Sequence, residues 1–76
     1  MPDKTFKLVE LVGSSDQSIQ QAVRNAIKRA SQSLKGISWF EVTQIRGNVA
    51  DGEVSQFQVT LKVGFRILDE AELGGA

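Results

Sequence analysis

The clearest pattern of hydrophobic and polar positions lies between Ser15 and Lys35. Apolar residues recur there three and four positions apart, which is the spacing of one face of an α-helix: Ile19, Ala22, Val23, Ala26, Ile27, Ala30 and Leu34. Ser14 and Gln17 have the spacing of a capping box, and Gly36 can end a helix in a left-handed conformation. The pattern therefore predicts a helix over residues 15–35.

Three other segments have the character of β-strands. Residues 5–12 are rich in β-branched and apolar residues and are followed by Gly13. Residues 37–49 form the second strand, and Asp51 and Gly52 are typical of a tight hairpin turn. Residues 54–68 alternate almost perfectly, with an apolar face at the odd positions Phe57, Val59, Leu61, Val63, Phe65 and Ile67. The predicted order is β-α-β-β.

The connections between these elements predict the topology of the sheet. A helical crossover makes the first and second strands parallel, and the hairpin makes the third antiparallel to the second. With the long third strand in the middle, all neighbours are antiparallel and the order is 1-3-2. The helix then covers one face. We expect one α+β domain over residues 1–76, ordered from about 4 to 68, with a flexible tail at residues 69–76.

The second strand places the only tryptophan on the face that the helix leaves open. Phe40 and Val42 fit the helix-covered face, so alternation turns Trp39, Glu41 and Thr43 the other way. An exposed indole leaves roughly 150–250 Å² of aromatic surface in water unless a subunit or a flat ligand covers it. From spacing alone, packing between subunits is the commoner explanation and a ligand platform is the alternative.

Length and composition indicate how a domain this small is stabilised. A chain of 76 residues buries only roughly 62% of its unfolded surface. Without cysteine it has no disulfide and no thiolate metal site, and without histidine it lacks the usual zinc ligand and neutral-pH catalyst. Association is the remaining route to stability, so we expect an oligomer.

Charge excludes several kinds of partner. Nine basic residues balance nine acidic ones and no basic run occurs, whereas nucleic-acid binders cluster positive charge. No apolar stretch approaches the roughly 20 residues that span a bilayer. The N-terminus has no apolar signal segment. The expected protein is cytoplasmic, without nucleic-acid or membrane partners.

Three separated segments together resemble the dodecin family. They read VELVGSS from Val9, SWFEVTQIRG from Ser38 and FQVTLKVGFR from Phe57, in the family's order and spacing. The resemblance covers about residues 4–68. It implies a β-α-β-β chain that assembles as a hollow homododecamer, binds flavins at subunit interfaces and serves flavin storage, buffering or sequestration.

The resemblance also implies a set of flavin-binding residues. Trp39 matches the indole that stacks on the isoalloxazine ring, two flavins lying between tryptophans of symmetry-related subunits and losing their photochemistry there. Gln58 matches the glutamine that hydrogen-bonds the pyrimidine end. Arg46 matches an arginine near the flavin, and a guanidinium suits the phosphate of FMN. Ser38 stands where several relatives have an aspartate, so it brings a hydroxyl without charge.

The bacterial type, which this sequence resembles most, favours FMN over riboflavin. Some bacterial members also bind coenzyme A near the three-fold axes, and Lys7, Arg29 and Arg66 are the candidate phosphate contacts here. Taken one at a time, Gln58, Arg46 and Arg66 read as ordinary surface residues.

Three other functions are alternatives to flavin storage. A structural or ion-binding shell without flavin is the main alternative, although ion-associated members lack the tryptophan that this chain has. An enzyme is disfavoured because mutually stacked flavins leave no open ring face, and Glu41 is the nearest carboxylate; we predict no catalytic residue and no metal ligand. An RNA-binding sheet is disfavoured because Phe57 and Phe65 face the core.

Overall fold

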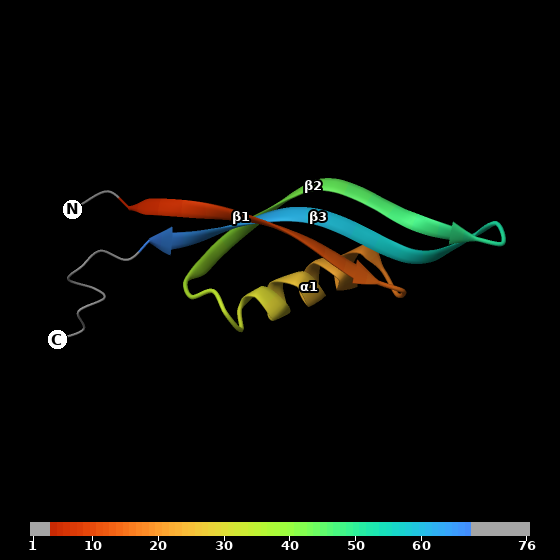
Figure 1. Cartoon of the computed structure of the whole chain (residues 1–76), viewed down its shortest axis with the longest axis horizontal. Helices are drawn as coiled ribbons and strands as arrows, with labels where there is room; N and C mark the ends of the chain where they lie inside the picture. Colours follow the sequence, from red (N-terminus) through yellow and green to blue (C-terminus); the bar gives the residue numbers. More distant parts are fainter. Residues whose placement is uncertain (1–3, 68–76) are drawn as a thin grey trace.

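The computed structural model describes residues 4–67 and consists of one sheet and one helix (Figure 1). The elements in chain order are β1 (Thr5–Ser15), α1 (Ile19–Ala30), β2 (Ile37–Ala50) and β3 (Glu53–Ile67). β3 lies in the middle of an antiparallel sheet of order β1-β3-β2. The predicted α+β fold and strand order are confirmed, while Leu68 and the predicted tail lie outside the described residues.

The core lies between α1 and the odd-numbered face of β3. Val59, Leu61 and Val63 are fully buried, and they pack against the small residues of the helical stripe, of which Ala22 is also fully buried. The predicted contact between the helix stripe and the odd positions of the third strand is therefore confirmed. Alanine brings the helix close to the sheet, and Gly13 of β1 brings it closer, since a Cβ there would lie 2.2 Å from the carbonyl oxygen of Ala22.

The start of the helix differs from the prediction. β1 continues to Ser15, which pairs with Phe57, so Ser14 lies in a strand and does not cap the helix. Ser18 is the N-cap, and its hydroxyl oxygen accepts a hydrogen bond from the backbone N–H of Gln21 at 2.9 Å. Two Ser-x-x-Gln spacings lie near the start of the helix, and the pairing of β1 with β3 decides between them.

The end of the helix also differs from the prediction. α1 ends at Ala30, and a turn over residues 31–33 follows, in which the N–H of Leu34 donates to the carbonyl of Ala30 at 2.8 Å. Gly36 does have a positive φ of 74°, but it leads into β2, and its carbonyl accepts from the N–H of Arg66 at 3.2 Å. Leu34 still packs against the core, so the stripe continues beyond the helix.

The hairpin between β2 and β3 forms where it was predicted. Asp51 and Gly52 have φ values of 53° and 77°, as a tight two-residue hairpin turn with two left-handed positions requires. β2 begins at Ile37 as predicted and reaches Ala50, and β3 begins at Glu53.

A bulge in β2 changes which side chains share a face. Val42 pairs with Leu61 and Gln44 pairs with Thr60, which leaves Thr43 as an extra residue. The hydroxyl of Thr43 donates to the carbonyl of Thr60 at 3.2 Å. The prediction that strict alternation runs through Thr43 is wrong. Trp39 and Glu41, at odd positions before the bulge, lie on the helix-free face, whereas after the bulge the even positions lie there.

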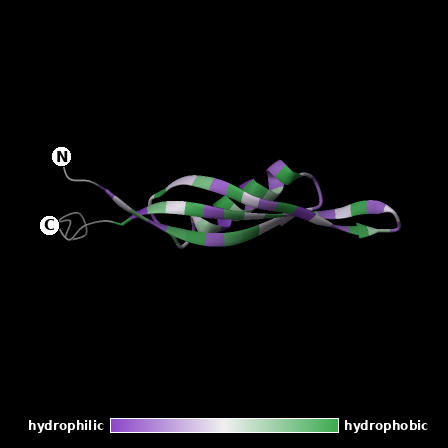
Figure 2. Ribbon diagram, turned by 90° about the horizontal axis from the view of Figure 1, so that it is seen from above, coloured by the Kyte–Doolittle hydropathy of each residue, from purple (hydrophilic) through white to green (hydrophobic). Residues whose placement is uncertain are grey.

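The sheet is much longer than the helix that covers it. The molecule measures 57 × 20 × 13 Å. The 12 residues of α1 span about 18 Å, whereas the 15 residues of β3 span about 50 Å. α1 packs on β1 and β3, so the helix side of β2 stays open, and hydrophobic residues recur along all three strands (Figure 2). Phe40 and Val42 face the helix side as predicted but are exposed.

Candidate functional site

Trp39 lies on the helix-free face, beside the backbone of β3. It pairs with Gly64, and a Cβ at Gly64 would lie 2.3 Å from two indole carbons. Glycine is therefore required for the indole to lie this close to the sheet. The Trp39 side chain is 42% exposed. A broad aromatic surface fixed against a strand and half open to solvent can accept a flat ring by stacking.

Phe6 extends the aromatic surface across the sheet. Its ring centroid lies 6.5 Å from that of Trp39, with the two ring planes inclined by 58°. Phe6 lies on β1 and pairs with Arg66, so it shares the helix-free face. Phe6 is not among the residues predicted from the sequence, because the uneven pattern of the first strand does not show which face its side chain occupies.

A second group of side chains lies farther along the same face. The Nε–H of Arg46 donates to Oε1 of Gln58 at 2.9 Å, and Nε2 of Gln58 donates to Oε1 of Gln56 at 3.1 Å. Nδ2 of Asn48 donates to the same oxygen of Gln56 at 3.3 Å. The terminal nitrogens of Arg46 make no hydrogen bond among residues 4–67, so they are free to bind an anion.

The bulge at Thr43 is what brings Arg46 to Gln58. Without the extra residue, alternation from Trp39 would turn Arg46 toward the helix side. With it, Arg46 pairs with Gln58 and Asn48 pairs with Gln56. The sequence did not identify Gln56 and Asn48 as residues of this site. The one indication for Gln56 was that it lies two residues before Gln58 and therefore on the same face of the third strand.

A single chain does not join Trp39 to Gln58. Trp39 lies over Gly64, which is six residues from Gln58 along β3, so the two are separated by about 20 Å. This distance exceeds what one fused aromatic ring system spans. A ligand that contacts both kinds of side chain therefore needs residues from more than one copy of the chain.

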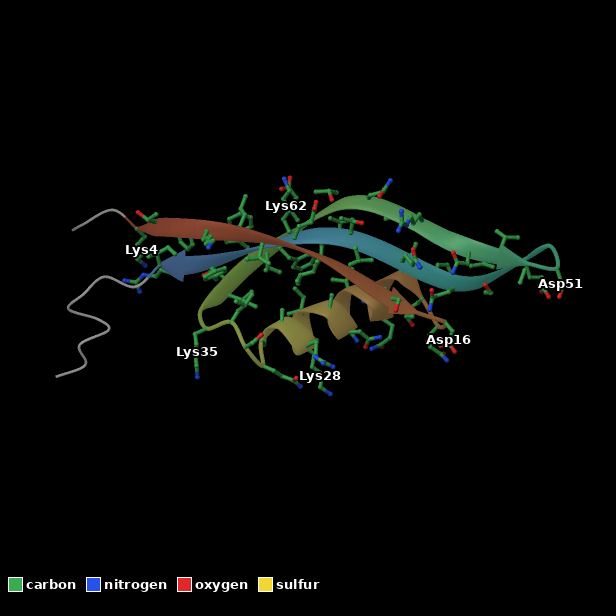
Figure 3. All side chains as sticks on the ribbon, viewed as in Figure 1. Lys4, Asp16, Lys28, Lys35, Asp51 and Lys62 are labelled. Carbon is green, nitrogen blue, oxygen red and sulfur yellow. The ribbon has the colours of Figure 1, made fainter. Side chains whose placement is uncertain are left out.

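Charged residues occupy the space between the two groups. Lys62 of β3 pairs with Glu10 of β1 on one side and with Glu41 of β2 on the other. Lys62 points away from α1 on the helix-free side (Figure 3). Two carboxylates beside one ammonium make the middle of this face acidic, in contrast to the Arg46 end. Within the described part of the chain, no three acidic side chains are grouped so that they could hold a metal ion.

The remaining predicted contacts lie near the opposite end of the sheet from the hairpin. Ser38, the extra residue of a second irregularity in β2, donates its hydroxyl to the carbonyl of Gly36 at 3.2 Å. Lys7 pairs with Phe65 on the helix side, whereas Arg66 pairs with Phe6 on the helix-free side. Arg29 lies in the last turn of α1. One chain thus does not place Lys7, Arg29 and Arg66 on a common face.

The chain is similar to known proteins over most of its length. The family model described as Dodecin matches residues 5–68. The dodecin of Thermus thermophilus is 44% identical over 64 residues, which cover 84% of this chain and 93% of that protein. The structure of dodecin from Streptomyces coelicolor is 50% identical, with a TM-score of 0.86, and the match covers 92% of this chain and 100% of that chain.

A more distant structure shares the fold alone. The calcium dodecin of Mycobacterium tuberculosis, described as a calcium-chelating antigen, is 24% identical with a TM-score of 0.74. The match covers 87% of this chain and 94% of that chain. Separately, no helix among residues 4–67 has the length and apolar character needed to cross a bilayer.

Proposed function

This chain belongs to the dodecin family, and from that premise we propose that it stores and buffers a flavin, FMN or riboflavin, stacked on Trp39 between copies of the chain. The family consists of small flavin-binding proteins that self-assemble.

The observation that carries the proposal is the setting of Trp39. Its indole is held against Gly64 on the face without the helix and is 42% exposed, so one chain presents an uncovered aromatic platform. Two such platforms related by a two-fold axis can enclose flat rings between them. An electron-rich indole in contact with an excited flavin quenches it by rapid electron transfer, which is the basis of the proposed protective role.

Gln58 and Arg46 serve as the polar half of the site in this proposal. The carboxamide of Gln58 offers a donor and an acceptor to the pyrimidine edge of the flavin. Arg46 already holds Oε1 of Gln58, so the amide is oriented before a ligand arrives. The terminal guanidinium nitrogens suit the phosphate of FMN. Trp39 and Gln58 of one chain lie about 20 Å apart. The Gln58 and Arg46 side chains of one copy therefore bind a flavin that is stacked on the Trp39 of another copy.

The proposal describes a binding protein rather than an enzyme. Rings stacked between two indoles and against one another leave no face for a substrate. The chain also has no His, Cys or Tyr to relay protons. We extend the proposal to a homododecameric shell, with Ser38 near the flavin side chain. Lys7, Arg29 and Arg66 of different copies are candidate contacts for coenzyme A.

The test is the spectrum of the purified, assembled protein and the identity of what it releases. We expect the absorption bands of an oxidised flavin, and FMN or riboflavin by mass spectrometry after denaturation. Protein isolated without ligand should quench the fluorescence of added FMN. A colourless preparation that leaves FMN fluorescence unchanged would contradict flavin storage and favour the structural or ion-binding shell.

A further inference from the structure

A groove runs between α1 and β2 on the helix side of the sheet. It has a volume of about 510 Å³ and is lined by Gln20, Val23, Arg24, Ile27, Lys28 and Phe40. Its floor is apolar, because Val23, Ile27 and Phe40 contribute hydrocarbon surface. Phe40 is 52% exposed, so this chain leaves the floor uncovered. Arg24 and Lys28 of α1 add two cations to the lining, and Lys28 points away from the sheet (Figure 3).

The far end of the β2–β3 hairpin has the opposite character. Because Ser15 at the end of β1 pairs with Phe57, residues 53–56 of β3 pair with β2 alone and extend past the rest of the sheet (Figure 1). We call residues 48–55 the hairpin tip. Val49 and Val54 of the tip are 72% and 57% exposed. Asp51 and Glu53 add two exposed carboxylates.

We propose that the groove between α1 and β2 receives the hairpin tip of a second copy of this chain. The two surfaces match in polarity and in charge. The valines of the tip cover the apolar floor, and the carboxylates of the tip approach Arg24 and Lys28 at the rim. Apolar burial supplies most of the free energy, whereas the charge pairs fix the register and exclude other partners.

The tip of a chain cannot enter its own groove. Phe40 in the groove floor pairs with Val63, which is nine residues from Val54 along the same strand, a separation of about 30 Å. The hairpin is a continuous antiparallel ladder that runs away from the groove, so it cannot fold back. The occupant is therefore a second copy, and the contact joins two different surfaces.

A contact between different surfaces must repeat from one copy to the next. Such a head-to-tail interface forms a closed ring if the rotation closes and a filament if it does not. This contact involves neither Trp39 nor Gln58, so it goes beyond the proposed flavin site. Tests of it report on assembly and need no flavin, which separates its failure from a failure of flavin binding.

Cross-linking tests the contact directly. The chain contains no cysteine, so two introduced thiols are the only ones present. After oxidation of the assembled I27C/V54C protein, we expect a ladder of dimers, trimers and higher covalent species on non-reducing gels. Neither single variant can form more than a dimer. As a matched control, V12C/V54C places the first thiol on the exposed helix-free face. The proposal would be overturned if V12C/V54C formed as many covalent oligomers as I27C/V54C, or if I27C/V54C formed none.

Charge exchange provides a second measurement that does not require disulfide formation. We expect K28E and E53K each to raise the concentration at which the assembly dissociates by roughly fivefold, and K28E/E53K to restore it. K35E is the control, because Lys35 lies in the connection between α1 and β2 and does not line the groove. Sedimentation of dilution series gives the masses. Additive effects of K28E and E53K, without rescue in the double variant, would contradict the contact.

Discussion

At the scale of single residues, the site depends on the absence of a side chain. Gly64 allows the indole of Trp39 to lie where any other residue would place a Cβ 2.3 Å from its ring carbons. Gly64 also lies on the face opposite Val63 and Leu61, so a change there does not enter the core. A substitution at Gly64 can therefore move the indole without disturbing the packing of the core.

We predict that Gly64→Ala lowers the affinity for FMN by roughly tenfold. This loss corresponds to the lower part of the range of free energies measured for stacking of an aromatic side chain on a base. The added methyl group forces the indole away from β3 and from its stacking position. The control is Thr60→Ala, which alters the same face of the same strand without touching the indole. Fluorescence titration with FMN measures both variants. Equal affinities of Gly64→Ala and wild type would show that the position of the indole does not matter.

Single residues also show what the sequence could and could not predict about the site. The common face of Trp39 and Gln58 follows from the alternation of the strands and the position of the helix, whereas a role for Gln58 in the site comes from the family resemblance. Arg46 could be assigned only through the family resemblance, because alternation alone turns it to the wrong face. Its true position depends on the bulge at Thr43, and one extra residue in a ladder leaves no clear mark in a single sequence.

At the scale of elements, strand pairing decides where the helix begins. The helical stripe, the hairpin turn and the strand order were predictable, because periodicity and turn residues are local signals. The limits of α1 were not. Ser14 and Ser18 each stand three residues before a glutamine, and only the pairing of β1 with β3 as far as Ser15 selects Ser18 as the cap.

We predict that Ser18→Ala destabilises the protein by about 1 kcal/mol, since the N–H of Gln21 loses its acceptor. Ser14→Ala, at the other candidate position, should change stability by less than about 0.5 kcal/mol, because the Ser14 side chain is exposed and does not cap the helix. Urea denaturation at a fixed concentration of assembled protein compares the two. A larger loss from Ser14→Ala than from Ser18→Ala would mean that the helix begins earlier than the structure has it.

At the scale of the whole molecule, one chain leaves too much apolar surface uncovered to be its functional form. The fully buried side chains of the core come from a short stretch of β3 and from α1, while aromatic and aliphatic residues remain exposed on both faces of the sheet. Composition had already indicated an oligomer. The structure adds the reason, because a helix of about 18 Å cannot cover a strand of about 50 Å.

The exposed surfaces divide by face, and the division suggests separate roles. The helix-free face carries Trp39 at one end and the Arg46–Gln58 pair about 20 Å away, so a complete flavin site requires copies placed against each other on this face. The helix side carries the groove, and the hairpin tip extends past the part of the sheet that β1 joins. In the proposed arrangement, contacts on the helix side build the shell and contacts on the helix-free face bind its ligand.

Titration of FMN with wild type and Trp39→Ala, alongside the assembled mass from light scattering, tests whether Trp39 stacks the flavin. We predict that wild type quenches FMN fluorescence to saturation at one flavin per chain. Trp39→Ala should keep the assembled mass and lose affinity by roughly 10- to 100-fold, as removal of a stacking ring implies. Two results would contradict the account. One is unchanged quenching by Trp39→Ala, and the other is dissociation of the Trp39→Ala assembly, which would make the indole a packing residue between subunits.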